Sequence, residues 1–281
     1  MSDPWKADEP IKEENIINES ERDSANPEND EYKLVKLESD GRLSPEFVSL
    51  GPLFIFEYDT PGAFVWTKPN EGTFALVELW GGGASGGLAL STTANIGFTA
   101  KGGTGGGYRR FWVPLSVLGA TVDGVVGAGG VARSGTPIFT QDGQNGGVTT
   151  FQNISVVGGV GGIARSTTAD MGNRQTAGTV GVFGENGGDG GGATANRNGI
   201  SVLFSSPGGG GAQASTGSGV GGEGALLSTK AGDGFHANSG SGSGGNGDSP
   251  GCGGGACAIG NASGTSTSGA GGNGFVRITV F

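Results

Sequence analysis

Few residues of this chain have the type and spacing that catalysis requires. The only histidine, His236, has no Ser or Cys nucleophile motif beside it, and it is expected to lie in a surface loop. The pattern Gly-x-Gly-x-x-Gly occurs within residues 217–222 and 240–245, but no expected strand precedes either copy. A chain with 64 glycines also produces this pattern by chance, so neither copy is interpreted as a nucleotide site.

Carboxylates and thiols give equally little basis for chemistry. Cys252 and Cys257 stand in the sequence Cys-Gly-Gly-Gly-Ala-Cys, and two thiolates with one histidine do not complete a tetrahedral zinc site. A local disulfide and a pair of free cysteines both remain open. The carboxylates of the glycine-rich part show no pairing of the glycosidase kind: Asp189, Glu185, Glu223, Asp233 and Asp248. We therefore expect no catalytic residues, no metal, no cofactor and no enzymatic activity.

Binding has more candidates, because aromatic and arginine residues are enriched at interaction hot spots. Those that lie between glycine clusters are candidate receptor contacts: Arg165, Arg174, Phe183, Arg197, Phe204, Phe235 and His236. For Phe183 and Phe204, a buried position that caps the glycine-rich structure is an equal or better interpretation.

Composition divides the chain near residue 50. Residues 1–50 contain one glycine, Gly41, and a net charge of −8, whereas residues 51–281 contain the other 63 glycines and a net charge of −2. This nearly neutral glycine-rich part lacks the basic footprint of nucleic-acid binding. We expect a soluble protein, because the N-terminus has no signal-peptide pattern and no apolar run reaches membrane-spanning length.

Residues 1–50 are interpreted as an attachment arm and a connector. Residues 1–31 are rich in Asp, Glu, Asn and Pro and cannot bury enough apolar surface to fold alone, so we expect them to become ordered on a partner. Their expected anchors are Trp5, Ile11, Ile16 and Ile17. Residues 32–50 begin with alternating apolar residues and continue through a Ser-Asp-Gly turn into a Pro-containing extended piece, which forms the connector.

The remaining domain, residues 51–281, is expected to be all-β, with an antiparallel, sandwich-like framework. Runs of β-branched and aromatic residues predict strands at 53–57, 63–67, 73–80, 108–113, 121–126, 148–152, 154–157, 200–204 and 275–281. The last run alternates cleanly, with Val276, Ile278 and Val280 on one face. Residues 75–80 match it best in length and character, so we predict that the two ends of the domain pair.

Between the strands lie glycine clusters without the Gly-X-Y period of collagen. One interpretation is disorder, which the high Gly and Pro content supports. The other is a bundle of extended polyproline-II-type helices. Glycine lets their backbones pack closely enough to hydrogen-bond to one another, in both parallel and antiparallel pairs. The second interpretation is preferred, because predicted strands bracket and interrupt the glycine-rich block and few charges keep it solvated.

Six phrases in fixed order carry a family resemblance: Thr60-Pro-Gly-Ala-Phe-Val-Trp-Thr-Lys-Pro69, Val77-Glu-Leu-Trp-Gly-Gly-Gly83, Gly102-Gly-Thr-Gly-Gly-Gly-Tyr108, Val125-Val-Gly-Ala-Gly-Gly130, Gly146-Gly-Val-Thr-Thr-Phe151 and Gly271-Gly-Asn-Gly-Phe-Val-Arg-Ile-Thr-Val280. They resemble the glycine-rich domain of bacteriophage tail-fibre and receptor-binding (adhesin) proteins. The resemblance implies a β framework with glycine-rich excursions whose variable loops touch the host surface. Unlike separate tip adhesins, this chain carries its own acidic arm.

The resemblance leads us to expect a virion protein, a fibre or adhesin attached through its arm to other virion proteins. Its expected receptor is a host cell-surface glycan or an outer-membrane protein, and a homotrimer is one expected assembly because phage fibres are commonly trimers. The alternative is a structural appendage without a receptor, such as a capsid head fibre or decoration protein. A bacterial surface matrix protein is disfavoured by the missing signal peptide.

Overall fold

A computed structural model of the chain describes residues 16–17, 34–35, 52–92, 98–137, 139–166, 176, 184–185, 198–214, 217–223, 229–237 and 239–281. The chain divides into two units, Met1–Pro52 and Leu53–Phe281. In the first unit, the described strands β1 (Ile16–Ile17) and β2 (Leu34–Val35) pair in parallel. The second unit holds every other described element, and it is described below from its base to its tip.

At the base of the second unit lies a five-stranded antiparallel sheet with the order β15-β8-β5-β21-β3. Its strands are β15 (Gly184–Glu185), β8 (Tyr108–Pro114), β5 (Phe74–Trp80), β21 (Phe275–Val280) and β3 (Phe54–Tyr58). The predicted pairing of the domain ends is confirmed: β21 aligns with β5 from Phe275 opposite Trp80 to Val280 opposite Ala75. The start and the end of the unit are thus held together in one sheet.

A second sheet faces the first, with the order β13-β12-β9-β4 and antiparallel neighbours. Its strands are β13 (Ile154–Val156), β12 (Thr149–Phe151), β9 (Thr121–Val126) and β4 (Gly62–Thr67). One apolar core joins both sheets: Trp66 and Phe151 of the second sheet pack with Leu79 and Ile278 of the first, and all four are fully buried. The predicted sandwich-like β framework is therefore present, with one short 3-10 turn, η4 (Leu115–Val117), among its connections.

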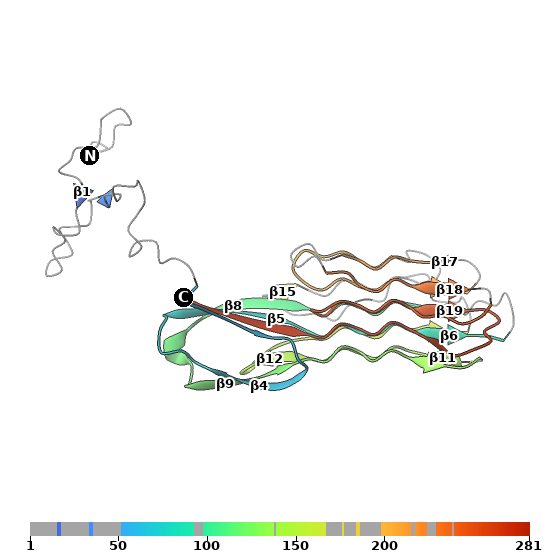
Figure 1. The fold of residues 1–281 in the computed structure, drawn as a ribbon, viewed down its shortest axis with the longest axis horizontal. Helices are drawn as coiled ribbons and strands as arrows, with labels where there is room; N and C mark the ends of the chain where they lie inside the picture. Colours follow the sequence, from blue (N-terminus) through green and yellow to red (C-terminus); the bar gives the residue numbers. More distant parts are fainter. Residues whose placement is uncertain are drawn as a thin grey trace, which may run out of the picture. The chain divides into compact units, whose positions relative to one another are not determined.

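From the base, the chain runs back and forth in extended glycine-rich segments that lie side by side (Figure 1). Their hydrogen bonds repeat every three residues, as the segment 81–87 shows. Its backbone N–H groups donate to three neighbouring segments in turn. Gly81, Ala84 and Gly87 donate to the carbonyls of Gly107, Thr104 and Lys101 on the first neighbour. Gly82 and Ser85 donate to Gly147 and Gln144 on the second, and Gly83 and Gly86 donate to Gly272 and Gly269 on the third. A three-residue turn without internal hydrogen bonds is the property of a polyproline-II helix, so the predicted glycine-helix bundle is confirmed.

Two helices of the bundle are surrounded on all sides. Segment 81–87 donates to segments 101–107, 142–148 and 268–274, and accepts from 127–133, 157–163 and 251–256. Segment 251–256 has six neighbours as well: 81–87, 101–107, 205–211, 229–234, 242–248 and 268–274. Every residue of both segments is buried. Both orientations occur, because 157–163 runs parallel to 81–87 while 101–107 runs antiparallel to it.

Close packing explains why these segments need glycine. A Cβ atom added to Gly86 would overlap the carbonyl oxygen of Gly255, and one added to Gly83 would overlap that of Cys252. Both obstacles are backbone atoms of the neighbouring central helix, which cannot swing aside as a side chain can. Glycine is therefore required here by the approach of two backbones rather than by a turn.

Short strands replace the glycine helices at the far end, the tip. One sheet has the order β11-β6-β19-β18 and another the order β14-β7-β16-β17, while β10 and β20 form a separate pair. Their bounds are β11 (Phe139–Gln141), β6 (Leu88–Leu90), β19 (Cys257–Ile259), β18 (Phe235–Ala237), β14 (Ala164–Arg165), β7 (Thr99–Ala100), β16 (Ala212–Gln213), β17 (Gly217–Ser218), β10 (Ser134–Gly135) and β20 (Ser266–Thr267). The sequence did not predict these two- and three-residue strands.

The strand predicted at 200–204 is wrong. Gly199 and Val202 donate to Val220 and Glu223, three residues apart on both sides, so this segment is one more helix of the bundle. Its apolar residues motivated the strand prediction, but they are not sufficient to form a strand here. The segment lies beside another glycine-rich segment, whose own hydrogen bonds follow the three-residue repeat.

Candidate functional site

The tip lies at the opposite end of the unit from its first and last strands (Figure 1). Three of the predicted receptor contacts, Arg165, Phe235 and His236, lie on tip strands. The other candidates are placed elsewhere or lie outside the described residues. Arg174, Phe183 and Arg197 are among the latter.

The predicted arm anchors are described only in part. Trp5 and Ile11 lie outside the described residues. Ile16 and Ile17 form β1 and pair with Leu34 and Val35, which is a statement about their backbones alone. Their role in attachment therefore stays a prediction.

Phe204 lies at the base of the bundle and not at the tip. Its carbonyl oxygen accepts a hydrogen bond from the indole nitrogen of Trp80 at 3.0 Å, and its ring stacks on Tyr108 with centroids 5.9 Å apart. The guanidinium of Arg110 lies 5.9 Å from the same ring. Because Trp80 and Tyr108 stand where strands pass into glycine helices, Phe204 covers this junction, although it is half-buried and not fully buried.

Phe235 and His236 are neighbours with different surroundings. Phe235 packs against an apolar tip cluster that contains Leu88, Leu90 and Ile259, and its ring occupies the space beside Gly242. His236 is exposed. Phe235 therefore stabilises the tip, whereas His236 is available to a ligand.

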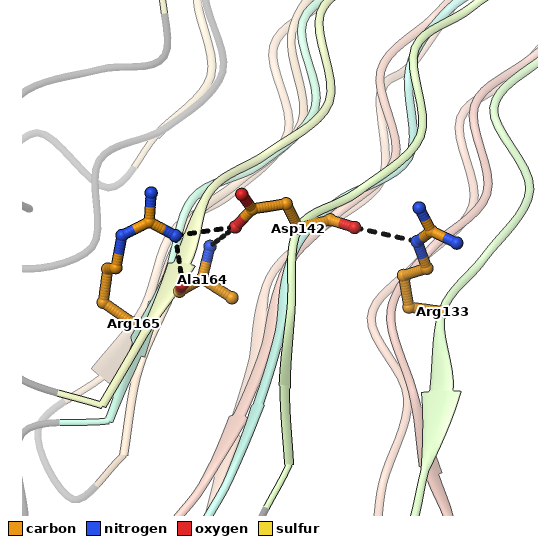
Figure 2. Close-up of polar contacts among 4 residues, drawn as sticks. All are labelled: Arg133, Asp142, Ala164 and Arg165. Atoms are coloured by element: carbon orange, nitrogen blue, oxygen red, sulfur yellow. Dashed lines mark hydrogen bonds and ion pairs between the residues drawn. The ribbon is translucent and has the colours of Figure 1, made fainter.

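Arg165 belongs to a polar cluster shown in Figure 2. One of its terminal nitrogens, Nη1, is 2.9 Å from Oδ1 of Asp142 and 2.6 Å from the carbonyl oxygen of Ala164. Asp142 Oδ1 also accepts from the Ala164 backbone N–H at 2.7 Å. On the other side, Arg133 Nε donates to the Asp142 carbonyl oxygen at 2.8 Å. The half-exposed ion pair is thus held in place by the backbone of Ala164 on β14.

Lys101 completes this region, and the sequence analysis did not single it out. It follows β7, is only 7% exposed, and is joined to the Arg165 strand because its N–H donates to the Ile163 carbonyl at 2.8 Å. Burial, and then the positive charge of Arg165, lower the pKa of its ammonium group. The signal was available: Lys101 is a lone charged residue at the start of an uncharged glycine segment.

The residues first considered for catalysis have structural surroundings. Cys252 and Cys257 are both free and fully buried, so the local disulfide is absent. Burial raises the pKa of each thiol to about 12. Asp233 accepts hydrogen bonds from the Gly221 N–H at 2.8 Å and the Lys230 ammonium at 3.2 Å. The side chain of Glu185, and the whole of Asp189, lie outside what the structure describes.

Within the described ranges, no three His, Cys, Asp or Glu residues gather closely enough to hold a metal ion. In the same ranges, no helix is long and apolar enough to cross a membrane.

Sandwich, glycine-helix bundle and stranded tip together define an all-β protein whose middle is built from packed backbones rather than from a side-chain core. The chain belongs to the glycine-rich domain family, whose model matches residues 59–281. This match begins in the turn before β4 and ends with the last residue, so it covers the bundle, the tip and all of the base except β3. No curated protein shows significant similarity to the chain.

Proposed function

We propose that this protein is a bacteriophage virion fibre or adhesin, which is attached through its N-terminal arm and presents its glycine-rich domain for host recognition. One observation supports this most directly: the second unit is a rod of hydrogen-bonded backbones with its first and last strands at one end and its tip loops at the other. An attachment point and a display surface at opposite ends are what a recognition fibre needs.

The construction of the rod favours a recognition surface that can change without loss of the fold. Bundle contacts are made between backbone N–H and C=O groups, so they do not depend on which side chains the tip carries. The residues between tip strands can then vary in sequence on a fixed frame, as in other scaffolds whose loops carry binding. The proposed role is binding to a host surface glycan or outer-membrane protein, without catalysis.

The proposed attachment partner is another virion protein. Residues 1–50 carry a net charge of −8, which is most of the −10 of the whole chain, and this favours a basic surface as the docking site of the arm. A homotrimer is compatible with this proposal, because several arms would then bind in parallel and raise the avidity of attachment.

Deletion and tip variants test the proposal separately. Removing residues 1–48 is expected to abolish incorporation into virions, which immunogold labelling of purified particles detects. His236→Ala and Arg165→Gln are expected to leave incorporation intact but to reduce adsorption to host cells. The matched control is Val220→Ala, an exposed change in a bundle segment.

The alternative role is a structural appendage without a receptor, such as a head fibre or decoration protein. In that case the deletion has the same effect, but particles that carry the tip variants adsorb like the wild type. Normal adsorption of those particles would therefore reject host recognition and leave attachment as the function.

A further inference from the structure

Four charged residues lie at one level of the rod, where glycine helices pass into tip strands. Arg133 is the last residue before β10, Asp142 the first after β11, Arg165 the last of β14, and Lys101 the first after β7. Backbone bonds place their segments side by side: Gly143 N–H donates to Gly162 at 2.7 Å, and Lys101 N–H to Ile163 at 2.8 Å. The segments therefore follow one another in the order 133, 142, 165, 101 around the central helix 81–87.

The single carboxylate of this group is already used. Asp142 Oδ1 accepts from Arg165 Nη1 and from the Ala164 N–H, and the Asp142 carbonyl accepts from Arg133 Nε (Figure 2). These contacts orient the two guanidinium groups, yet the Nη1 and Nη2 atoms of Arg133 and the Nη2 atom of Arg165 make no hydrogen bond within the described part of the chain. The two arginines thus lie on opposite sides of Asp142, and these contacts orient their remaining N–H donors.

Lys101 makes the excess of positive charge in this group energetically unfavourable. As a residue Lys101 is only 7% exposed, and none of the described residues accepts a hydrogen bond from its ammonium. A positive charge on a largely buried residue next to a second positive charge favours the binding of a counter-ion. Its surroundings supply a second cation, Arg165, instead of an anion. Lys230, in contrast, is exposed and pairs with Asp233.

We propose that Lys101 and Arg165 bind an oxyanion, either a carboxylate or a phosphate group, of an acidic surface polysaccharide. A guanidinium offers parallel N–H donors that match the two oxygens of such a group, and an ammonium adds a compact charge. Residues 51–281 carry a net charge of −2, so no extended basic track competes for a nucleic-acid backbone. This inference deepens the proposed host recognition, and it rests on that function only for the source of the anion.

The test measures anion binding by the full-length chain in solution, by thermal denaturation and by titration calorimetry. The probes are inorganic phosphate and glucuronate, each compared with sodium chloride at equal ionic strength. Three variants are compared with the wild type: Lys101→Met, Arg165→Gln and the matched control Lys230→Met, which removes the same charge from a paired, exposed lysine.

Phosphate, glucuronate or both are expected to raise the melting temperature of the wild type and of Lys230→Met beyond the chloride control. Lys101→Met and Arg165→Gln are each expected to bind about tenfold more weakly or worse, because each loses a charged hydrogen bond to the anion. Without anion, Lys101→Met is expected to melt at the same temperature as the wild type or higher, since it removes a positive charge next to Arg165 from a largely buried residue. Should it not fold, Arg165→Gln, a change at a half-exposed side chain, decides alone.

Which probe binds identifies the source: phosphate alone indicates a phosphorylated glycan, and glucuronate alone a uronic-acid polymer. Equal effects of both anions and chloride, or unchanged affinity in Arg165→Gln, would overturn the site. Because these experiments need neither virions nor cells, a failure here leaves the adsorption test of host recognition untouched, and a failure of adsorption leaves this site standing as an anion site.

Discussion

At the scale of single residues, the bundle depends on the absence of a side chain at particular places. We predict that Gly86→Ala lowers the free energy of unfolding by about 1–3 kcal/mol or more, because the new methyl group would overlap the Gly255 carbonyl and separate the two central helices. Chemical denaturation measures the change. Gly264→Ala is the matched control, since a Cβ there meets nothing nearer than the Ser241 side chain at 3.4 Å. Equal destabilisation by both variants would contradict the packing argument.

Two buried thiols provide a second prediction at this scale, with its sign fixed by the shifted pKa. The pKa of Cys252 and of Cys257 rises from 9.0 to about 12 on burial, so between these values the unfolded chain releases protons that the folded chain keeps. Stability therefore falls as pH rises from 9 towards 12, by up to about 1.4 kcal/mol per pH unit for each thiol.

Other groups also titrate in this range, so the informative quantity is a difference. The double variant Cys252→Ala/Cys257→Ala is expected to show a shallower decline in unfolding free energy above pH 9 than the wild type does. Parallel curves for the two proteins would mean that the thiols ionise in the folded state.

At the scale of elements, the strand β21 closes the domain, and its two faces should behave differently. Ile278 is fully buried between the sheets, so Ile278→Ala is expected to cost about 2–5 kcal/mol. Arg277 points to the other face, where its Nε lies 2.8 Å from a partly exposed Glu57, and Arg277→Ala is expected to cost less than about 1 kcal/mol. Urea denaturation of both variants measures this contrast, and similar losses would contradict the assigned register.

The elements also show how far the sequence could be interpreted alone. β21 and its partner β5 were predictable, because alternation identified a buried face and only one distant run matched it in length. The glycine helices were predictable in kind, since no other ordered structure requires so many residues without a Cβ. The neighbours of each helix could not be predicted. The partners of Gly81, Gly82 and Gly83 lie on three segments far apart in the chain, and nearly identical glycine sequences do not reveal which segment lies beside which.

Short tip strands were missed for a related reason. A two-residue strand such as β14 has no alternation to detect, so the cluster of Arg165, Asp142 and Lys101 could not be assembled beforehand. Arg165 was identified by its residue type alone. Lys101 was overlooked because a lysine usually indicates exposure, and its burial follows from the bundle around it.

At the scale of the whole molecule, the glycine-helix bundle links two separate apolar regions, the sandwich core at the base and the clusters of the tip. If the lattice of backbone bonds is stable, its centre should be the last part to open. We predict that amides of segments 81–87 and 251–256 exchange with solvent only by global unfolding. An unfolding free energy of about 5 kcal/mol already slows exchange by a factor on the order of 10³.

Peripheral helices provide the internal comparison for hydrogen exchange measured by mass spectrometry. Segments 198–203 and 219–223 contain exposed residues and have fewer neighbours among the described segments, so their amides should open locally and exchange faster than those of the two central helices. Gly86→Ala should then accelerate exchange in segment 251–256 as well as in its own segment, because each central helix bonds to the other. Rapid, uniform exchange across all glycine segments would mean that the bundle does not hold the tip at a fixed distance from the base, and a rod-like recognition fibre would lose its physical basis.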